Sequence, residues 1–231
     1  MLGGNRDIRE IQVNNSGMFR DVQSNQQEVN GMSYSDFTME DLKQKLGLRF
    51  IQDERLFPRP PEHAISDALI TYLATYKPLA LAIDTEKARS EYIIAPLLGE
   101  LTVTHRHQMS LFSGIEFNVD RAQGLNGRCD YILSQSDDQY SLTTPIVMMV
   151  EAKNDNIKSG IPQCGAEMVA AQTYNAHQQH PKETVYGCVS TGTTWKFLRL
   201  QHHDLAIDVD EYYIDLPEKI MGILMHMCLG S

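Results

Sequence analysis

The chain has 231 residues, of which 42% are hydrophobic and 22% charged, with 15 glycines and 9 prolines. This ordinary globular composition excludes collagen-like, coiled-coil and wholly disordered proteins, and the length fits one large domain with an appendage. The formal net charge is −10. Such a charge disfavours diffuse binding to nucleic acid, which depends on Lys and Arg, but it leaves a local nucleic-acid site open.

Neither a membrane span nor a secretion signal is apparent. No run approaches the roughly 18 apolar residues of a membrane helix, and the first residues lack the apolar core of a signal peptide. The cysteines form no CxxC pair, so we expect buried thiols and no structural zinc site. The sequence therefore predicts a soluble, cytoplasmic protein that does not bind membranes.

Three parts are expected along the chain. Residues 1–31 are rich in Asn, Gln, Ser and Gly and have no sustained apolar period, which predicts a flexible N-terminal tail. Residues 32–78 are predicted to form a helical N-terminal appendage. Residues 79–231 are predicted to form the main domain.

Hydrophobic periodicity and turn residues predict an α/β (α+β) chain. A helix is expected from Thr38 to Gly47, with Asp41 completing a capping box, and further helices over His63–Tyr76, from Asp84 or Thr85 to Leu101 with a kink at Pro96, over Pro162–Gln178 and over Leu216–Cys228. The expected strands are Ile115–Val119, Cys129–Ser134, Pro145–Val150, Thr184–Val189, Thr194–Leu200 and Leu205–Val209.

Two predicted strands carry charges that their apolar surroundings disfavour. Asp130 lies inside the run Cys129–Leu133, and Asp is depleted from strands. The next strand ends in Glu151-Ala152-Lys153, and alternation places Glu151 and Lys153 on one face. If the two strands are neighbours, Asp130 and Glu151 converge. Two carboxylates, with the Ala152 carbonyl, are ligands that suit Mg²⁺.

Two predicted helices add polar residues to this set. Glu91 interrupts an apolar or aromatic stripe at helical spacing, Ala88, Tyr92 and Ala95. Gln163 and Glu167 are four residues apart, so they share a helix face just downstream of Lys153.

Asp130, followed after 20 intervening residues by Glu151-Ala152-Lys153, resembles the PD-(D/E)xK nuclease superfamily. The likeness extends to the helical acid Glu91 and to Gln163. More narrowly, a group of small uncharacterised bacterial nuclease-fold proteins is similar from roughly Ser33 onward, through Ser90-Glu91 with Pro96-Leu97, Gly127 to Asp130, Glu151 to Asn154, and Gln163-Cys164 with Glu167-Met168. The sequence departs from the superfamily pattern in two ways. Cys129, and not Pro, precedes Asp130, and no target-recognition domain can be recognised.

The resemblance implies a restriction-endonuclease-like core, with a helix, three antiparallel strands, a helix and a strand, in a mixed central sheet flanked by helices. It also implies a Mg²⁺-dependent phosphodiesterase acting on nucleic acid, most readily a DNA endonuclease, with Mn²⁺ as a substitute metal. Asp130, Glu151, the Ala152 carbonyl and Glu91 would hold the metal. Lys153 would act on the attacking water and the phosphate, and Gln163 would position the site.

Alternatives remain open at this stage. The alternative to this leading hypothesis is a nuclease-fold binding or interaction module without turnover, because function belongs to sites and not to folds. DNA and RNA are not distinguished, and a homodimer is compatible with the sequence. Arg128, Lys158 and Lys196 are candidate phosphate contacts by their proximity to the motif. Trp195 is expected to pack in the core.

Overall fold

The computed structural model describes residues 31–51 and 53–230. From Gly31 onward these residues cluster into one compact unit. Apart from Gly31, the predicted tail lies outside the described residues. Contrary to the predicted boundary between residues 78 and 79, one helix, α2 (Asp67–Ile83), runs through that point. The predicted appendage also contributes a strand, β1 (Arg49–Ile51), to the main sheet.

A single mixed sheet runs through the described part of the chain. Seven of its eight strands follow the order β1-β7-β6-β5-β4-β3-β2, and β8 pairs with the first two residues of β6. The pairs β1/β7 and β4/β5 are parallel and the others are antiparallel. The remaining strands are β2 (Ser110–Glu116), β3 (Arg128–Ser134), β4 (Ile146–Ala152), β5 (Thr184–Ser190), β6 (Thr194–Gln201), β7 (Asp204–Ile207) and β8 (Tyr212–Tyr213).

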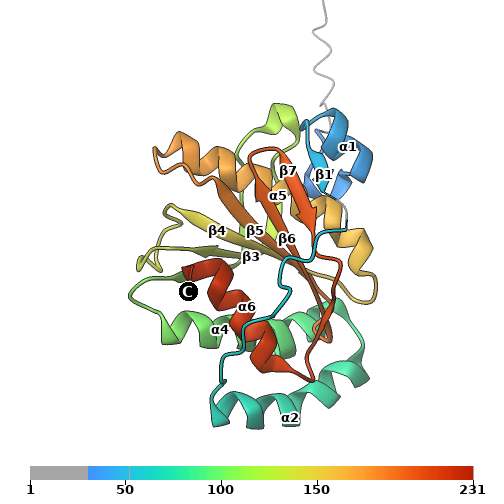
Figure 1. Cartoon of the computed structure of the whole chain (residues 1–231), viewed down its shortest axis with the longest axis vertical. Coiled ribbons are helices and arrows are strands. Elements are labelled where there is room, and N and C mark those ends of the chain that lie inside the picture. Colours follow the sequence, from blue (N-terminus) through green and yellow to red (C-terminus); the bar gives the residue numbers. More distant parts are fainter. Residues whose placement is uncertain (1–30, 52, 231) are drawn as a thin grey trace, which may run out of the picture. The chain divides into compact units, whose positions relative to one another are not determined.

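Helices cover both faces of this sheet. Figure 1 shows α5 on one side of the sheet and α2, α4 and α6 on the other. Each face has its own apolar core, so the central strand β4 is buried on both sides along its whole length. The helical elements are η1 (Tyr34–Asp36), α1 (Met39–Gln44), α2, α3 (Glu86–Arg89), the π-helical segment η2 (Ser90–Ile94), α4 (Ala95–Thr104), η3 (Arg121–Gln123), α5 (Ile157–His177) and α6 (Pro217–Leu229).

The order of elements around the site matches the prediction. The helical stretch α3–α4 is followed by the antiparallel strands β2, β3 and β4, then by α5, and then by β5, which lies parallel to β4. The capping box at the start of α1 is also confirmed, because Thr38 and Asp41 exchange the expected bonds. None of the helices in the described residues is long and apolar enough to cross a membrane.

The predicted starts of α2 and α5 are wrong for different reasons. A helix is predicted from His63, but α2 begins only at Asp67. The segment before it packs against α6, because the His63 amide donates to the Glu218 carbonyl at 2.9 Å. Helix α5 begins at Ile157, five residues before Pro162, because Asn156 caps it by accepting the Lys158 amide at 3.0 Å. An N-cap is a stronger start signal than an internal proline.

Near Pro96, where a kink is predicted, the structure has a π turn. Pro96 has no N–H for the usual bond to a carbonyl four residues earlier, and the wider segment η2 directly precedes α4. Such an insertion rotates the residues around the helix axis. As a result, Ile93, Ile94 and Leu97 face the core.

Three strands differ most from the prediction. β1 and β8 were not predicted, because two or three residues are too short for a periodic signal. β2 begins at Ser110, five residues before the predicted start. Within β2, Gly114 has a positive φ of 63°, a conformation that favours glycine.

Candidate active site at the end of strands β3 and β4

Asp130 lies where β3 and β4 stop pairing. The last paired residues are Tyr131 and Val150. Two residues beyond Val150, the Ala152 amide donates a hydrogen bond to Asp130 Oδ2 at 2.8 Å, so the carboxylate takes the place of a strand carbonyl. Asp is disfavoured inside a ladder, but at this position its side chain satisfies a main-chain donor. The other oxygen of the half-buried carboxylate remains for a ligand.

Glu151 is the buried acid of the site. Its side chain is 2% exposed and its Oε1 accepts a hydrogen bond from the Lys153 ammonium. Its Oε2 is buried and has no hydrogen-bond partner in the described chain. Burial, and then the negative charge of Asp130, raise the pKa of Glu151 to about 8, although Lys153 opposes the shift. Asp130 and Glu151 lie on neighbouring strands, each one residue beyond the last pair, and the like charge of Asp130 disfavours ionisation of Glu151.

Lys153 follows the end of β4, and both its main-chain amide and its ammonium group form hydrogen bonds. Its amide donates to the Ser190 carbonyl at 2.8 Å, and its ammonium contacts Glu151 and the Gln163 Oε1, the latter at 3.3 Å. Burial lowers the pKa of Lys153, but the charge and hydrogen bond of Glu151 outweigh burial, so the net direction is upward. The ammonium therefore stays charged.

A glycine makes room for the Lys153 stem, and sequence reasoning missed it. A Cβ at Gly160 in α5 would lie 2.7 Å from Val189 Cγ1, 3.1 Å from Lys153 Cγ and 3.2 Å from Lys153 Cε. Real side chains do not approach this closely. The absence of a side chain at this position lets α5 pack directly over the lysine.

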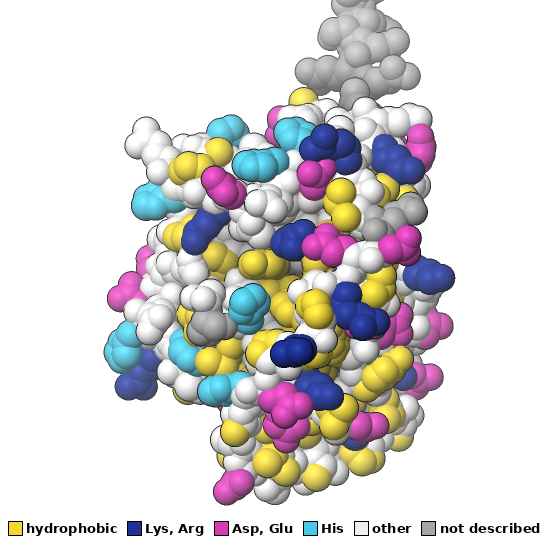
Figure 2. All heavy atoms as spheres, viewed as in Figure 1, with side chains coloured by type: hydrophobic (Ala, Val, Ile, Leu, Met, Phe, Trp, Pro, Cys, Tyr) yellow, Lys and Arg dark blue, Asp and Glu magenta, His cyan; other side chains and the backbone are white. Residues whose placement is uncertain are grey.

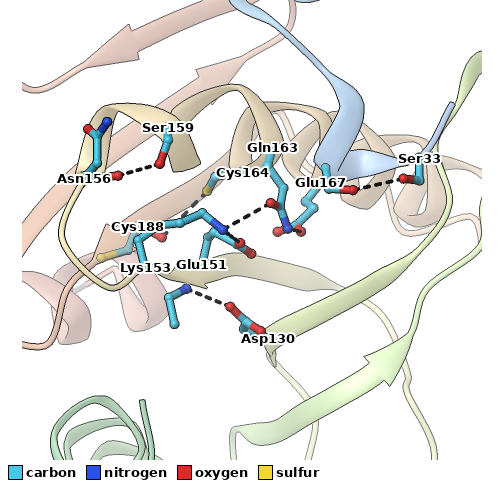
Figure 3. Close-up of polar contacts among 12 residues, drawn as sticks. Ser33, Asp130, Glu151, Lys153, Asn156, Ser159, Gln163, Cys164, Glu167 and Cys188 are labelled. Carbon is cyan, nitrogen blue, oxygen red and sulfur yellow. Dashed lines mark hydrogen bonds and ion pairs between the residues drawn. The ribbon is translucent and has the colours of Figure 1, made fainter. Parts of the chain in front are cut away.

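Helix α5 extends the polar contacts into the core. Gln163 Nε2 donates to Glu167 Oε1 at 3.3 Å, which confirms the predicted shared face. Figure 3 shows the sequence of side chains from Glu151 through Lys153 and Gln163 to Glu167, with Asp130 bonded to the neighbouring main chain. Glu167 is fully buried and its Oε2 has no partner in the described residues.

Glu91 occupies a different environment from the one predicted. Its side chain is 52% exposed and forms an ion pair with Lys87 at 2.8 Å. The π turn accounts for the misjudged helical phase. Glu91 nevertheless lines a cleft of about 240 Å³ together with Asp130 and Ala152. It therefore stands at the wall of the site and makes no direct bond to either strand carboxylate in the described structure.

The same cleft contains residues that sequence reasoning did not select. Glu86 lines it, and its negative charge is felt by both Glu151 and Lys153. Ser90 and Tyr131 also line it, and their hydroxyl groups are 2.6 Å apart. Glu86 stands in the first turn of α3, where an acid is ordinary. The sequence therefore carried no signal for it.

Of the three candidate phosphate contacts, one faces the cleft. Arg128 lines it and is largely exposed, with a loose ion pair to Glu116 at 3.8 Å. Lys158 lines a separate cleft at the start of α5, and the Lys196 ammonium donates to the Val209 carbonyl at 3.2 Å. On the face of the described chain seen in Figure 2, basic and acidic side chains are interspersed.

The expected core residues are confirmed. Trp195 is fully buried, and its Nε1 donates to the Gly192 carbonyl at 3.0 Å. All four cysteines are buried free thiols: Cys129, Cys164, Cys188 and Cys228. Burial raises the pKa of the Cys129 thiol, and the nearby carboxyl groups of Glu167 and Glu151 raise it further.

The residues fit a hard divalent cation, although the site has few protein ligands. Among the described residues, no three His, Cys, Asp or Glu side chains form a metal-binding group. Mg²⁺ nevertheless usually keeps several waters and is bound through one or two carboxylates together with substrate phosphate. Asp130, Glu151 with its unpartnered buried oxygen, and the cleft-lining Ala152 match that donor set.

No protein-family model matches the chain, and no curated protein matches it. What the site can do is therefore inferred from its residues and their geometry.

Proposed function

We propose that the protein is a Mg²⁺-dependent phosphodiesterase that acts on nucleic acid, most readily a DNA endonuclease, with a restriction-endonuclease-like core of the PD-(D/E)xK type. One observation carries the proposal. Asp130, Glu151 and Lys153 meet where β3 and β4 part, and Glu151 keeps a buried oxygen without a partner. Such an oxygen is costly unless a ligand binds it.

The topology supports the same proposal. A helix, three antiparallel strands, a helix and a strand parallel to the third follow in the order that the resemblance implies. Fold alone does not define an activity. The added support is that Asp130 and Glu151 lie on β3 and β4, the middle strands of the β2–β5 group, and that Lys153 directly follows β4.

Each residue has a distinct part in the proposed reaction. Asp130, Glu151 and the Ala152 carbonyl would hold the metal, and Glu91 stands at the cleft wall as a more distant acid. A bound Mg²⁺ supplies positive charge that stabilises the phosphate as its negative charge increases. An ammonium has three hydrogens, and Lys153 uses two on Glu151 and Gln163. The third remains for the attacking water or the phosphate.

The cleft gives a phosphate a local route to the site despite the net charge of −10. Arg128 and Lys87 line it beside Asp130. Among the described residues, Arg128 forms an ion pair only with the exposed Glu116 on the neighbouring strand, and Lys87 only with the exposed Glu91 one helical turn away. Exposed ion pairs are weak. A phosphate would therefore compete for these two cations at little cost.

The experiment is a cleavage panel on the full chain. Circular duplex DNA, single-stranded DNA and single-stranded RNA are each incubated with Mg²⁺, with Mn²⁺ or with a chelator, using wild type, Asp130→Asn and Lys158→Met. We expect metal-dependent cleavage that Asp130→Asn abolishes and that Lys158→Met, in the separate cleft, retains. Absence of cleavage on every substrate would reject the proposal.

A second candidate is a binding module without turnover. It is favoured by the lack of a group of three metal-ligating side chains among the described residues and by the direct pairing of Lys153 with Glu151. In that case Mg²⁺ would bind weakly, and nucleic acid would be retained but remain uncut in the same panel.

A further inference from the structure

Glu167 is a buried acid that the proposed reaction does not use directly. It lies in the middle of α5, is fully shielded from solvent, and forms no ion pair within the described chain. Its Oε1 accepts the Gln163 amide, whereas Oε2 has no partner there. An acid in a core is costly to keep. Core packing therefore does not explain why an acid lies beside Gln163.

The Gln163 amide has two different ends, and Glu167 determines which way they point. Gln163 Nε2 donates to Glu167, so Oε1 is turned toward the Lys153 ammonium. In the opposite orientation, the amide NH₂ would face a cation that has only donors to offer. An acceptor at position 167 thus fixes the one orientation of Gln163 that can hold Lys153.

We propose that Glu167 is a positioning residue of this site, which sets the orientation of the Gln163 amide and through it holds the Lys153 ammonium beside Glu151. This inference rests on the proposed function for its effect on cleavage, but its structural part stands separately. Burial and the charge of Glu151 raise the pKa of Glu167 well above its usual range. An uncharged acid can be mimicked by glutamine, which keeps an accepting oxygen, and cannot be mimicked by leucine.

Three variants separate positioning from core packing. Glu167→Gln retains the acceptor, Glu167→Leu removes it with little change in volume, and Gln163→Leu removes the intermediate amide. Glu167→Leu leaves the Gln163 amide without its acceptor, which lowers stability, so each variant is first shown to be folded by circular dichroism. Thr173→Val is the matched control, because Thr173 lies on the same helix and its hydroxyl donates to the Val169 carbonyl, away from the site.

The first readout does not depend on activity. The nitrogen-15 NMR signal of the Lys153 ammonium, assigned by its loss in Lys153→Met, is recorded at neutral pH, where only hydrogen-bonded ammonium groups exchange slowly enough to be seen. We expect the same signal in wild type, Glu167→Gln and Thr173→Val, and a shifted, faster-exchanging signal in Glu167→Leu and Gln163→Leu, where the bond to Glu151 remains and the bond to Gln163 is lost. Its absence in wild type, or an unchanged signal in Glu167→Leu, would overturn the inference.

The second readout is single-turnover cleavage of the best substrate from the panel. Glu167→Leu should reduce the rate by about 10–100-fold, as is typical when a supporting residue is lost, with little change in KM. Glu167→Gln should stay within about threefold of wild type. A Glu167→Gln enzyme as slow as Glu167→Leu would overturn the inference. If wild type cleaves nothing, the proposed function fails, and the NMR result alone decides the role of Glu167.

Discussion

Asp130 on β3 accepts the main-chain amide of Ala152 on β4 at 2.8 Å, one residue beyond the last pair of their ladder. The side chain thereby ties two strand ends that have stopped pairing, while it presents a carboxylate to the cleft. The same residue is expected to contribute to stability and to metal binding, and substitutions can separate the two contributions.

Asp130→Ala removes both contributions and Asp130→Asn only one. A hydrogen bond to a charged group contributes about 1.5–3 kcal/mol, so Asp130→Ala should lower the free energy of unfolding by that amount in urea. Asparagine keeps an accepting oxygen, so Asp130→Asn should lose much less stability yet bind Mg²⁺ at least about tenfold more weakly. Equal Mg²⁺ affinity of Asp130→Asn and wild type in calorimetry would remove Asp130 from the metal site.

Metal binding should release a proton in neutral solution. Burial and Asp130 raise the pKa of Glu151 to about 8, and a metal binds the deprotonated form. Affinity for Mn²⁺ should therefore rise with pH up to about 8 and then level off. Calorimetry in two buffers of different ionisation enthalpy measures the released proton. Affinity that is independent of pH between 6 and 8 would contradict the pKa of Glu151.

The same raised pKa predicts how stability without metal depends on pH. Between the unfolded value near 4.5 and the folded value of about 8, the folded state binds a proton that the unfolded state has lost. The contribution of Glu151 to stability therefore falls as pH rises through this range. In Glu151→Gln this fall should be absent. Urea unfolding of both proteins at pH 5.5 and 8 with a chelator tests this, and an equal fall in both would contradict it.

Gly160→Ala should disturb the site from the helix side. The added Cβ would meet Val189 and the Lys153 stem, and overpacking costs about 1–3 kcal/mol. Gly99→Ala in α4 is the matched control, because a Cβ there meets nothing within 4 Å and alanine favours a helix by about 0.5–1 kcal/mol. Thermal unfolding should show the first variant destabilised and the second unchanged or stabilised. A Gly160→Ala protein as stable as wild type would show that α5 does not pack tightly over Lys153.

Glu91→Gln should affect the metal site little. Its carboxylate is half exposed and paired with Lys87, so its removal should leave Mg²⁺ affinity within about threefold of wild type, well short of the loss expected of a buried ligand. Calorimetry on Glu91→Gln and Asp130→Asn compares the two acids directly. A loss with Glu91→Gln as large as with Asp130→Asn would make Glu91 a ligand.

The residues that the sequence identified share one property: each is a charge inside an apolar pattern. Asp130 and Glu151 could be found in this way because alternation within a strand has a fixed period, and neighbouring strands bring such positions together. Gln163 and Glu167 followed from helical spacing. The sheet order around the site could also be predicted, because it depends on long elements with clear periods.

Local sequence patterns did not predict three features of the site: the exposure of Glu91, the start of α5 and the role of Gly160. The π turn rotates Glu91 out of the helical phase expected from the apolar spacing. The periodicity of the sequence does not reveal such a turn. At α5 two start signals compete, and the Asn156 cap prevails over Pro162. The role of Gly160 depends on contacts with Val189 and Lys153, which only the folded chain brings together.

The most direct measurement of the central claim is single-turnover cleavage at saturating Mg²⁺ by wild type, Lys153→Met and Lys158→Met. Methionine keeps most of the packed stem beneath Gly160 and removes the ammonium that contacts Glu151 and Gln163. Losing a preorganised donor of this kind should cost about 2.7–4 kcal/mol of transition-state stabilisation, or about 10²–10³ in rate. Mg²⁺ affinity should be unchanged or higher, because a cation beside the metal is removed. Lys158→Met should cleave like wild type. A well-folded Lys153→Met protein with wild-type rates would contradict the account.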